Sequence, residues 1–188
     1  YDIIQKKSGS TWILEKSHPN IWLTESLISS FPNSYFIGMQ RDVYQVVNSM
    51  LDHKGGNGVK IWFETLPQDK ISKFLGINKY NISYYQELPI EAKCVIRWLS
   101  HYYELERLKN NFPERVLVFD YTYFCNNFES ELNKLEQITN LDLKKYTEYP
   151  NPKSLIKFEN LSEDQLKIIE NTFEKESLNF RKLYYENN

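Results

Sequence analysis

Short apolar runs alternate along this 188-residue chain with stretches in which apolar residues recur at helical spacing. Four of the runs are short and apolar enough for buried strands, namely YDIIQ, TWILE, SYFIGM and RVLVFDY. The helical spacing predicts helices over residues 20–31, 43–51, 89–112 and 127–141, and a last helix after residue 162. This alternation favours an α/β fold with helices packed on a mostly parallel sheet.

Polar residues and helix breakers mark where the predicted elements start and stop. Asn20 and Asp42 are placed to cap the first two helices, and Ser162 with Gln165 forms a capping-box pattern before the last one. Glycines 55, 56 and 58 predict a loop, residues 59–86 predict short helices joined by irregular chain, and residues 150–160 predict a proline-rich connector. Without repeats or a shift in composition, residues 1–188 are expected to form a single domain.

Charge and cysteine content narrow the kind of partner. The net charge of −2 and pI near 6.0 give no overall attraction to nucleic acid or to an anionic membrane, so an anion site would have to be built locally. Cys94 and Cys125 are a poor basis for a disulfide framework or a metal site, which favours a reducing, cytoplasmic location. No signal peptide or run of about 20 apolar residues is visible. The chain begins at Tyr1 without an initiator Met, and we expect an N-terminal truncation.

The best candidate for such an anion site is Arg41. It follows the predicted strand SYFIGM and directly precedes a predicted helix, so its planar fork of donors lies near a helix N-terminus, where anions bind well. Ser49 lies eight positions later, about two helical turns along, and offers a hydroxyl. The alternative is that Arg41 pairs with Asp42 or another surface carboxylate and that Ser49 is an ordinary polar helix residue.

The stretch TWILEKSHPNIWLTESLISSFPNSYFIGMQRDVYQVVNSML resembles the central block of the sulfotransferases that use 3′-phosphoadenosine 5′-phosphosulfate. The match runs in order through these residues: Trp12, Lys16, Ser17, Pro19, Phe31, Pro32, Arg41, Asp42 and Ser49. The segment RWLSHYYELERLKNNFPERVLVFDYTYFCNNFESELNKLEQITNL resembles the later helix, strand and helix of the family, so the resemblance covers residues 11–141. It implies a P-loop-like three-layer α/β/α domain of the sulfotransferase type.

The resemblance also implies roles for individual residues. Arg41 and Ser49 correspond to the residues that contact the 3′-phosphate of the nucleotide. Glu15 matches the glutamate that acts as general base on the acceptor, and its neighbour Lys16 would steady negative charge on the transferring group. His18 is the alternative base. The expected donor is 3′-phosphoadenosine 5′-phosphosulfate, the expected acceptor is a small-molecule or carrier-bound hydroxyl or amine, and no metal, nucleic acid or membrane span is expected.

The chain departs from the family pattern at three places. Val43 replaces the usual proline after Arg-Asp, and no Arg-Lys-Gly segment follows near the C-terminus. The segment from Lys7 to Thr11 copies a phosphosulfate-binding loop but directly adjoins the Glu15–Lys16 block. It is either a hairpin turn between two strands, with the true loop upstream of Tyr1, or the phosphate loop itself, which would require a helix over residues 10–17.

Two other functions remain open at this point. One is a non-catalytic nucleotide-binding remnant or interaction module that keeps Arg41 and Ser49 but lacks a competent phosphosulfate loop. The other, a P-loop kinase relative, is disfavoured because the chain contains no G-x-x-x-x-G-K-[ST] sequence.

Overall fold

A computed structural model of the chain describes residues 12–17, 19–53, 57–146, 148–150, 155 and 160–186. The predicted segment YDIIQ, the Lys7–Thr11 segment and His18 lie outside these residues. The elements, in chain order, are α2 (Asn20–Ser30), β1 (Phe36–Gln40), α3 (Val43–Asp52), α4 (Asn57–Thr65), the 3-10 turn η1 (Tyr85–Glu87), α5 (Ile90–Asn111), β2 (Val116–Asp120), α6 (Tyr121–Asn126), α7 (Phe128–Thr139), the 3-10 turn η2 (Lys144–Tyr146), α8 (Glu163–Arg181) and the π-turn η4 (Lys182–Glu186).

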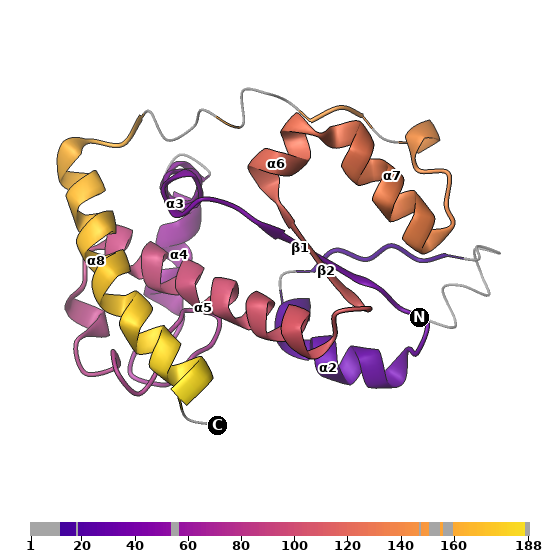
Figure 1. The fold of residues 1–188 in the computed structure, drawn as a ribbon. Coiled ribbons are helices and arrows are strands. Elements are labelled where there is room, and N and C mark those ends of the chain that lie inside the picture. Colours follow the sequence, from indigo (N-terminus) through magenta and orange to yellow (C-terminus); the bar gives the residue numbers. More distant parts are fainter. Residues whose placement is uncertain are drawn as a thin grey trace.

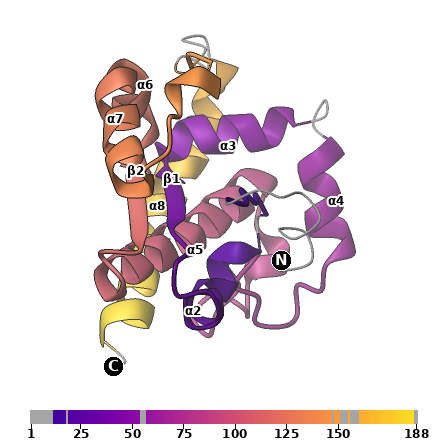
Figure 2. The same cartoon turned by 90° about the vertical axis from the view of Figure 1, so that its right-hand side faces the viewer.

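Two parallel strands lie between helices. β1 and β2 pair in register with Gly38 opposite Val118. The helices α6 and α7 lie on one side of the strands, and α2 and α5 lie on the other (Figure 1, Figure 2). Gly38 lets β1 lie close against α5, because a Cβ atom there would come within 2.5 Å of the Leu105 side chain.

The main core forms where α3, α4, α5 and α8 meet. Its fully buried apolar side chains include Val47 from α3, Val59 from α4, Leu99 from α5, and Ile169 and Phe180 from α8. α8 packs along α5 in Figure 1 and so closes the side of the molecule away from α6 and α7. The core therefore fixes α5 as the central support of the fold.

The caps and long helices agree well with the sequence pattern. The Asp42 carboxylate accepts hydrogen bonds from the backbone N–H groups of Tyr44 and Gln45, at 2.9 and 3.2 Å, and so caps α3 as predicted. The capping box of Ser162 and Gln165 is present at the start of α8. One cap was predicted one residue late, since Pro19 occupies the N-cap position of α2 and Asn20 is its first helical residue.

The predicted three-layer fold is only partly confirmed. Helices flank a small parallel sheet, but this sheet has two strands in the described part of the chain, not the larger number expected. Of the TWILE run, residues 12–15 are described, and they form neither a strand nor a helix. Leu14 is 94% exposed, so the apolar alternation there has no partner strand to pack against among the described residues.

The predicted loop was wrong at Gly58, and one helix was not predicted. Gly58 and Asn57 belong to helix α4 rather than to a loop. The physical reason is packing: a Cβ atom at Gly58 would lie 2.4 Å from the His53 ring, so glycine is required for the close approach of α3 and α4. The sequence analysis also missed α6, which begins directly after β2 because the Asp120 side chain caps it through the Tyr123 N–H at 2.7 Å.

Gly76 is a second position that requires glycine. Its φ is +80°, and a Cβ atom would lie 2.4 Å from the backbone oxygen of Ile96 in α5. We expect Gly76→Ala to lower the free energy of unfolding by about 1–3 kcal/mol, measured by chemical denaturation. The exposed Lys70→Ala in the same connection should change it by less than about 0.5 kcal/mol, and an equal loss in both variants would contradict this explanation.

Candidate functional site

Arg41 lies directly after β1 and is held in place by contacts on several sides. Its Nε donates to the side-chain oxygen of Gln45 at 2.6 Å, one turn along α3. Its guanidinium carbon lies 4.7 Å from the centre of the Tyr121 ring, and its backbone oxygen accepts a hydrogen bond from Trp98 Nε1 of α5 at 3.0 Å. These contacts join the end of β1 to α5 and α6, and they fix the position of the guanidinium.

Arg41 and Ser49 line the same cavity, of about 260 Å³. The end of β1 supplies Arg41, and α3 supplies Ser49 two turns along. Both side chains are partly buried. The structure therefore brings together the two residues that the sequence pairs as phosphate ligands, and Asp42, the carboxylate next to Arg41, is engaged as the cap of α3.

The cavity is also lined by residues that the sequence analysis did not single out. His53 follows α3 and lies 6.2 Å, ring centre to ring centre, from Trp62 of α4. Arg97 of α5 lines the cavity as well. No Asp or Glu is among the described residues that line it, so its charged groups are two arginines. Such a composition suits an anion.

Arg97 is the most deeply buried of these groups. Its guanidinium carbon lies 4.9 Å from the Trp62 ring centre and 4.5 Å from the Phe74 ring centre, and its Nη1 contacts Met50 Sδ at 3.6 Å. Burial lowers the pKa of Arg97 to about 10, against smaller opposing effects of Cys94 and Tyr85. The only sequence signal for it was an arginine inside the apolar run CVIRWL, and Trp62 gave none.

Glu15 and Lys16 do not line this cavity. Both are exposed and lie in the irregular segment before α2. The Glu15 carboxylate accepts a hydrogen bond from the side chain of Asn20, the first residue of α2. The structure therefore ties Glu15 to the start of α2 and leaves its other side open to solvent.

A row of aromatic rings connects the start of α2 with the cavity. Trp22 packs edge-on against His101 of α5, with ring centres 5.1 Å apart. His101 contacts Phe74 at 6.2 Å, and Phe74 contacts Trp62 in the cavity wall at 5.9 Å. These ring contacts connect the start of α2, where Asn20 donates a hydrogen bond to Glu15, with the cavity wall that includes Arg97.

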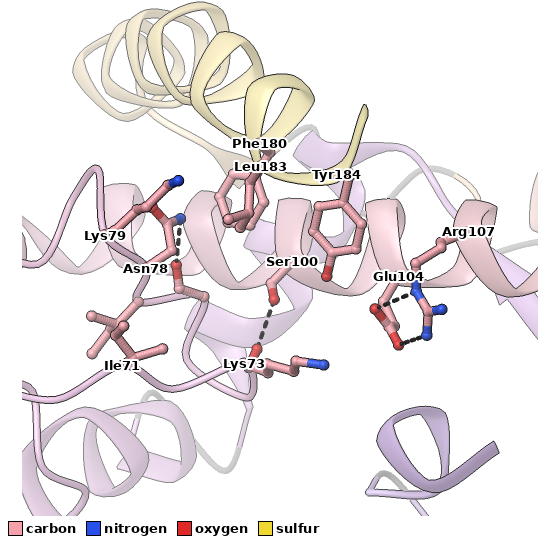
Figure 3. Close-up of a pocket in the computed structure, with 12 residues that line it drawn as sticks. Ile71, Lys73, Asn78, Lys79, Ser100, Glu104, Arg107, Phe180, Leu183 and Tyr184 are labelled. Atoms are coloured by element: carbon pink, nitrogen blue, oxygen red, sulfur yellow. Dashed lines mark hydrogen bonds and ion pairs between the residues drawn. The ribbon is translucent and has the colours of Figure 1, made fainter. Parts of the chain in front are cut away.

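A second cavity, of about 330 Å³, lies between α5, the connection before η1 and the C-terminal turns (Figure 3). Its lining includes the buried carboxylate of Glu104, which accepts two hydrogen bonds from Arg107 at 2.7 and 3.3 Å. These bonds raise the pKa of Arg107, and burial followed by the charge of Glu104 raises the pKa of Tyr184. Ser100 donates to the backbone oxygen of Lys73 at 2.7 Å. Lys73 and Lys79 also line this cavity, and its third cation, Arg107, is paired with the buried Glu104 carboxylate.

Among the described residues, no three His, Cys, Asp or Glu side chains gather closely enough to hold a metal ion. None of the helices in the same part of the chain is both long and apolar enough to cross a bilayer.

Comparison with known proteins gives one match. The model of the sulfotransferase family matches residues 1–145, a span that includes the cavity residues and the Glu15–Lys16 pair and that ends before α8. No curated protein and no solved structure shows significant similarity to the chain.

Proposed function

The chain belongs to the sulfotransferase family, and we propose that it transfers a sulfuryl group from 3′-phosphoadenosine 5′-phosphosulfate to a hydroxyl or amine acceptor. Family membership indicates a transferase acting on sulfuryl groups in general. The specific donor is our proposal. The observation that carries it is the cavity beside α3 that both Arg41 and Ser49 line.

The proposed nucleotide contact follows from the chemistry of that cavity. A guanidinium can donate two parallel hydrogen bonds to a phosphate, and the Ser49 hydroxyl can add another. We assign the 3′-phosphate of the nucleotide to Arg41 and Ser49. Trp62 in the cavity wall offers an aromatic face near this phosphate.

We assign the transfer step to Glu15 and Lys16. Sulfuryl transfer needs an oxygen or nitrogen nucleophile in line with the breaking sulfur–oxygen bond of the donor. The Glu15 carboxylate takes the proton of the acceptor as the new bond to sulfur forms, and adenosine 3′,5′-bisphosphate leaves. Lys16 steadies the negative charge on the transferring group. The hydrogen bond from Asn20 orients the Glu15 carboxylate.

One observation favours a second candidate, a non-catalytic nucleotide-binding module of the same family. Glu15 and Lys16 are exposed and lie outside the Arg41 cavity. A protein that only binds nucleotide would keep this cavity and show no transfer. Transfer of labelled sulfuryl from the donor, with a pool of hydroxyl and amine acceptors, distinguishes the two candidates.

The acceptor and the compartment are also proposals. We propose a small-molecule or carrier-bound acceptor. Cys94 and Cys125 are both free thiols, Cys94 fully buried, and burial raises the pKa of Cys94 to about 12. Two unpaired thiols support a reducing compartment such as the cytoplasm.

The proposed donor makes a direct prediction about binding. Adenosine 3′,5′-bisphosphate should bind at least about 10-fold more tightly than adenosine 5′-phosphate, because only the former carries the phosphate that Arg41 and Ser49 contact. Isothermal titration calorimetry on the purified protein measures both constants. Equal affinity for the two nucleotides would remove the basis for the donor assignment.

A further inference from the structure

Arg97 is a buried cation whose burial the fold alone does not explain. It is 5% exposed, and among the described residues no carboxylate forms an ion pair with it. Its Nε and Nη2 are buried and have no hydrogen-bond partner in the described part of the chain. An unpaired buried guanidinium is strongly unfavourable, so a fold that places one there gains nothing from it in stability.

The surroundings hold the Arg97 guanidinium in one place. Trp62 and Phe74 each present a ring to it, and the Met50 sulfur meets one of its nitrogens. Ring faces attract the charge but cannot accept the N–H groups in the plane of the guanidinium. The arrangement orients the cation while leaving hydrogen-bonding capacity for an additional acceptor.

A cavity lies beside Arg97, where an acceptor for its unpaired N–H groups can bind. Arg97 lines the same cavity as Arg41 and Ser49, yet it comes from α5 rather than from the end of β1 or from α3. Two arginines line this cavity and none of its described lining residues is a carboxylate, so the charge of the lining favours a bound anion. We propose that Arg97 is a second cationic ligand of the nucleotide's 3′-phosphate, approaching it from α5 alongside Arg41.

This inference rests on the proposed function for the identity of the anion, and it deepens that function in one respect. Arg97 provides an additional charge from the interior of the fold. A nucleotide bound there would be held by residues from α3, from α5 and from the end of β1.

Replacing Arg97 by Met tests the inference, because Met keeps much of the side-chain length and packs well against Trp62 and Phe74. Affinity for adenosine 3′,5′-bisphosphate should fall by about 10- to 150-fold, while affinity for adenosine 5′-phosphate should stay within about twofold. The melting temperature of the nucleotide-free protein should stay the same or rise, since an unpaired buried charge is removed. Arg97→Lys, which keeps a charge but loses the planar fork, should give an intermediate affinity.

The opposite pattern would overturn the inference. Unchanged affinity for the bisphosphate together with a lower melting temperature in Arg97→Met would make Arg97 a structural brace between α4 and α5. If Arg97→Met fails to fold, Arg97→Lys decides: wild-type affinity for the bisphosphate overturns the inference, and a weakened affinity confined to the bisphosphate supports it.

Failure of the proposed function is distinguishable from failure of this inference. If the wild-type protein binds no bisphosphate, the donor assignment fails, and inorganic sulfate becomes the probe in a thermal-shift titration. Stabilisation of the wild type by sulfate that is lost in Arg97→Met supports an anion ligand at Arg97. An equal response of the two proteins, or no response in either, overturns it.

Discussion

Replacing Glu15 by Gln is expected to lower the turnover of sulfuryl transfer by about 10²- to 10⁴-fold, the usual contribution of a positioned general base. The change is nearly isosteric, and a Gln side-chain oxygen can still accept the hydrogen bond that Asn20 donates to Glu15. Folding and nucleotide affinity should therefore be unaffected, since Glu15 does not line the Arg41 cavity. Turnover is measured as transfer of labelled sulfuryl from the donor to the acceptor.

Glu25→Gln is the matched control for this experiment. Glu25 is a half-exposed carboxylate of α2 that pairs with Arg107 at 2.8 Å and lines neither cavity. The substitution should leave turnover within about twofold of the wild type. Full turnover in Glu15→Gln would remove Glu15 as the base and make His18, which lies outside the described residues, the next residue to test.

The sequence predicts those parts of the fold whose signals are local. The long helix α5 has an apolar periodicity over 22 residues, and the caps at Asp42 and Ser162 act within one turn of the residues they stabilise. The strands β1 and β2 are apolar runs bounded by polar residues. Each of these signals is complete within a short window, and each element is present in the structure.

The errors arise where a distant contact decides the local structure. Gly58 has the composition of a loop, but it lies in helix α4, where a side chain would meet the His53 ring. Residues 12–15 have the alternation of a strand, but a strand requires a partner, and none of the described segments pairs with them. Neither the steric demand of a neighbouring helix nor the absence of a pairing strand can be read from the residues themselves.

The residues of the candidate site likewise divide into those with a local sequence signal and those without one. Arg41 and Ser49 were identified because they lie eight positions apart on one strand–helix unit and match the family's 3′-phosphate residues in the sequence resemblance. Arg97 and Trp62 line the same cavity but are separated from Arg41 by other elements, so only the tertiary structure brings them to it. Whether the Lys7–Thr11 segment is a hairpin turn or a phosphate loop stays a prediction, because that segment lies outside the described residues.

Replacing Arg41 by Ala is expected to weaken binding of adenosine 3′,5′-bisphosphate by about 10- to 150-fold, which corresponds to about 1.5–3 kcal/mol for the loss of charge-assisted hydrogen bonds. Affinity for adenosine 5′-phosphate should change little, because that nucleotide lacks the phosphate assigned to Arg41. Calorimetry on both nucleotides measures the difference. Arg181→Ala is the control, since it removes an exposed arginine at the end of α8 that does not line the cavity.

A loss of affinity in Arg41→Ala has two sources that must be separated. The substitution removes the phosphate contact, and it also leaves the Gln45 side-chain oxygen without the Arg41 N–H that it accepts at 2.6 Å. Gln45→Met removes that same contact from the other side while keeping the Arg41 charge. If disordering of the Arg41 side chain were the whole effect, Gln45→Met would weaken binding as much as Arg41→Ala. We expect it to cost less than about tenfold, because the guanidinium remains over the Tyr121 ring and within the cavity. Wild-type affinity for the bisphosphate in Arg41→Ala would show that the 3′-phosphate is bound elsewhere.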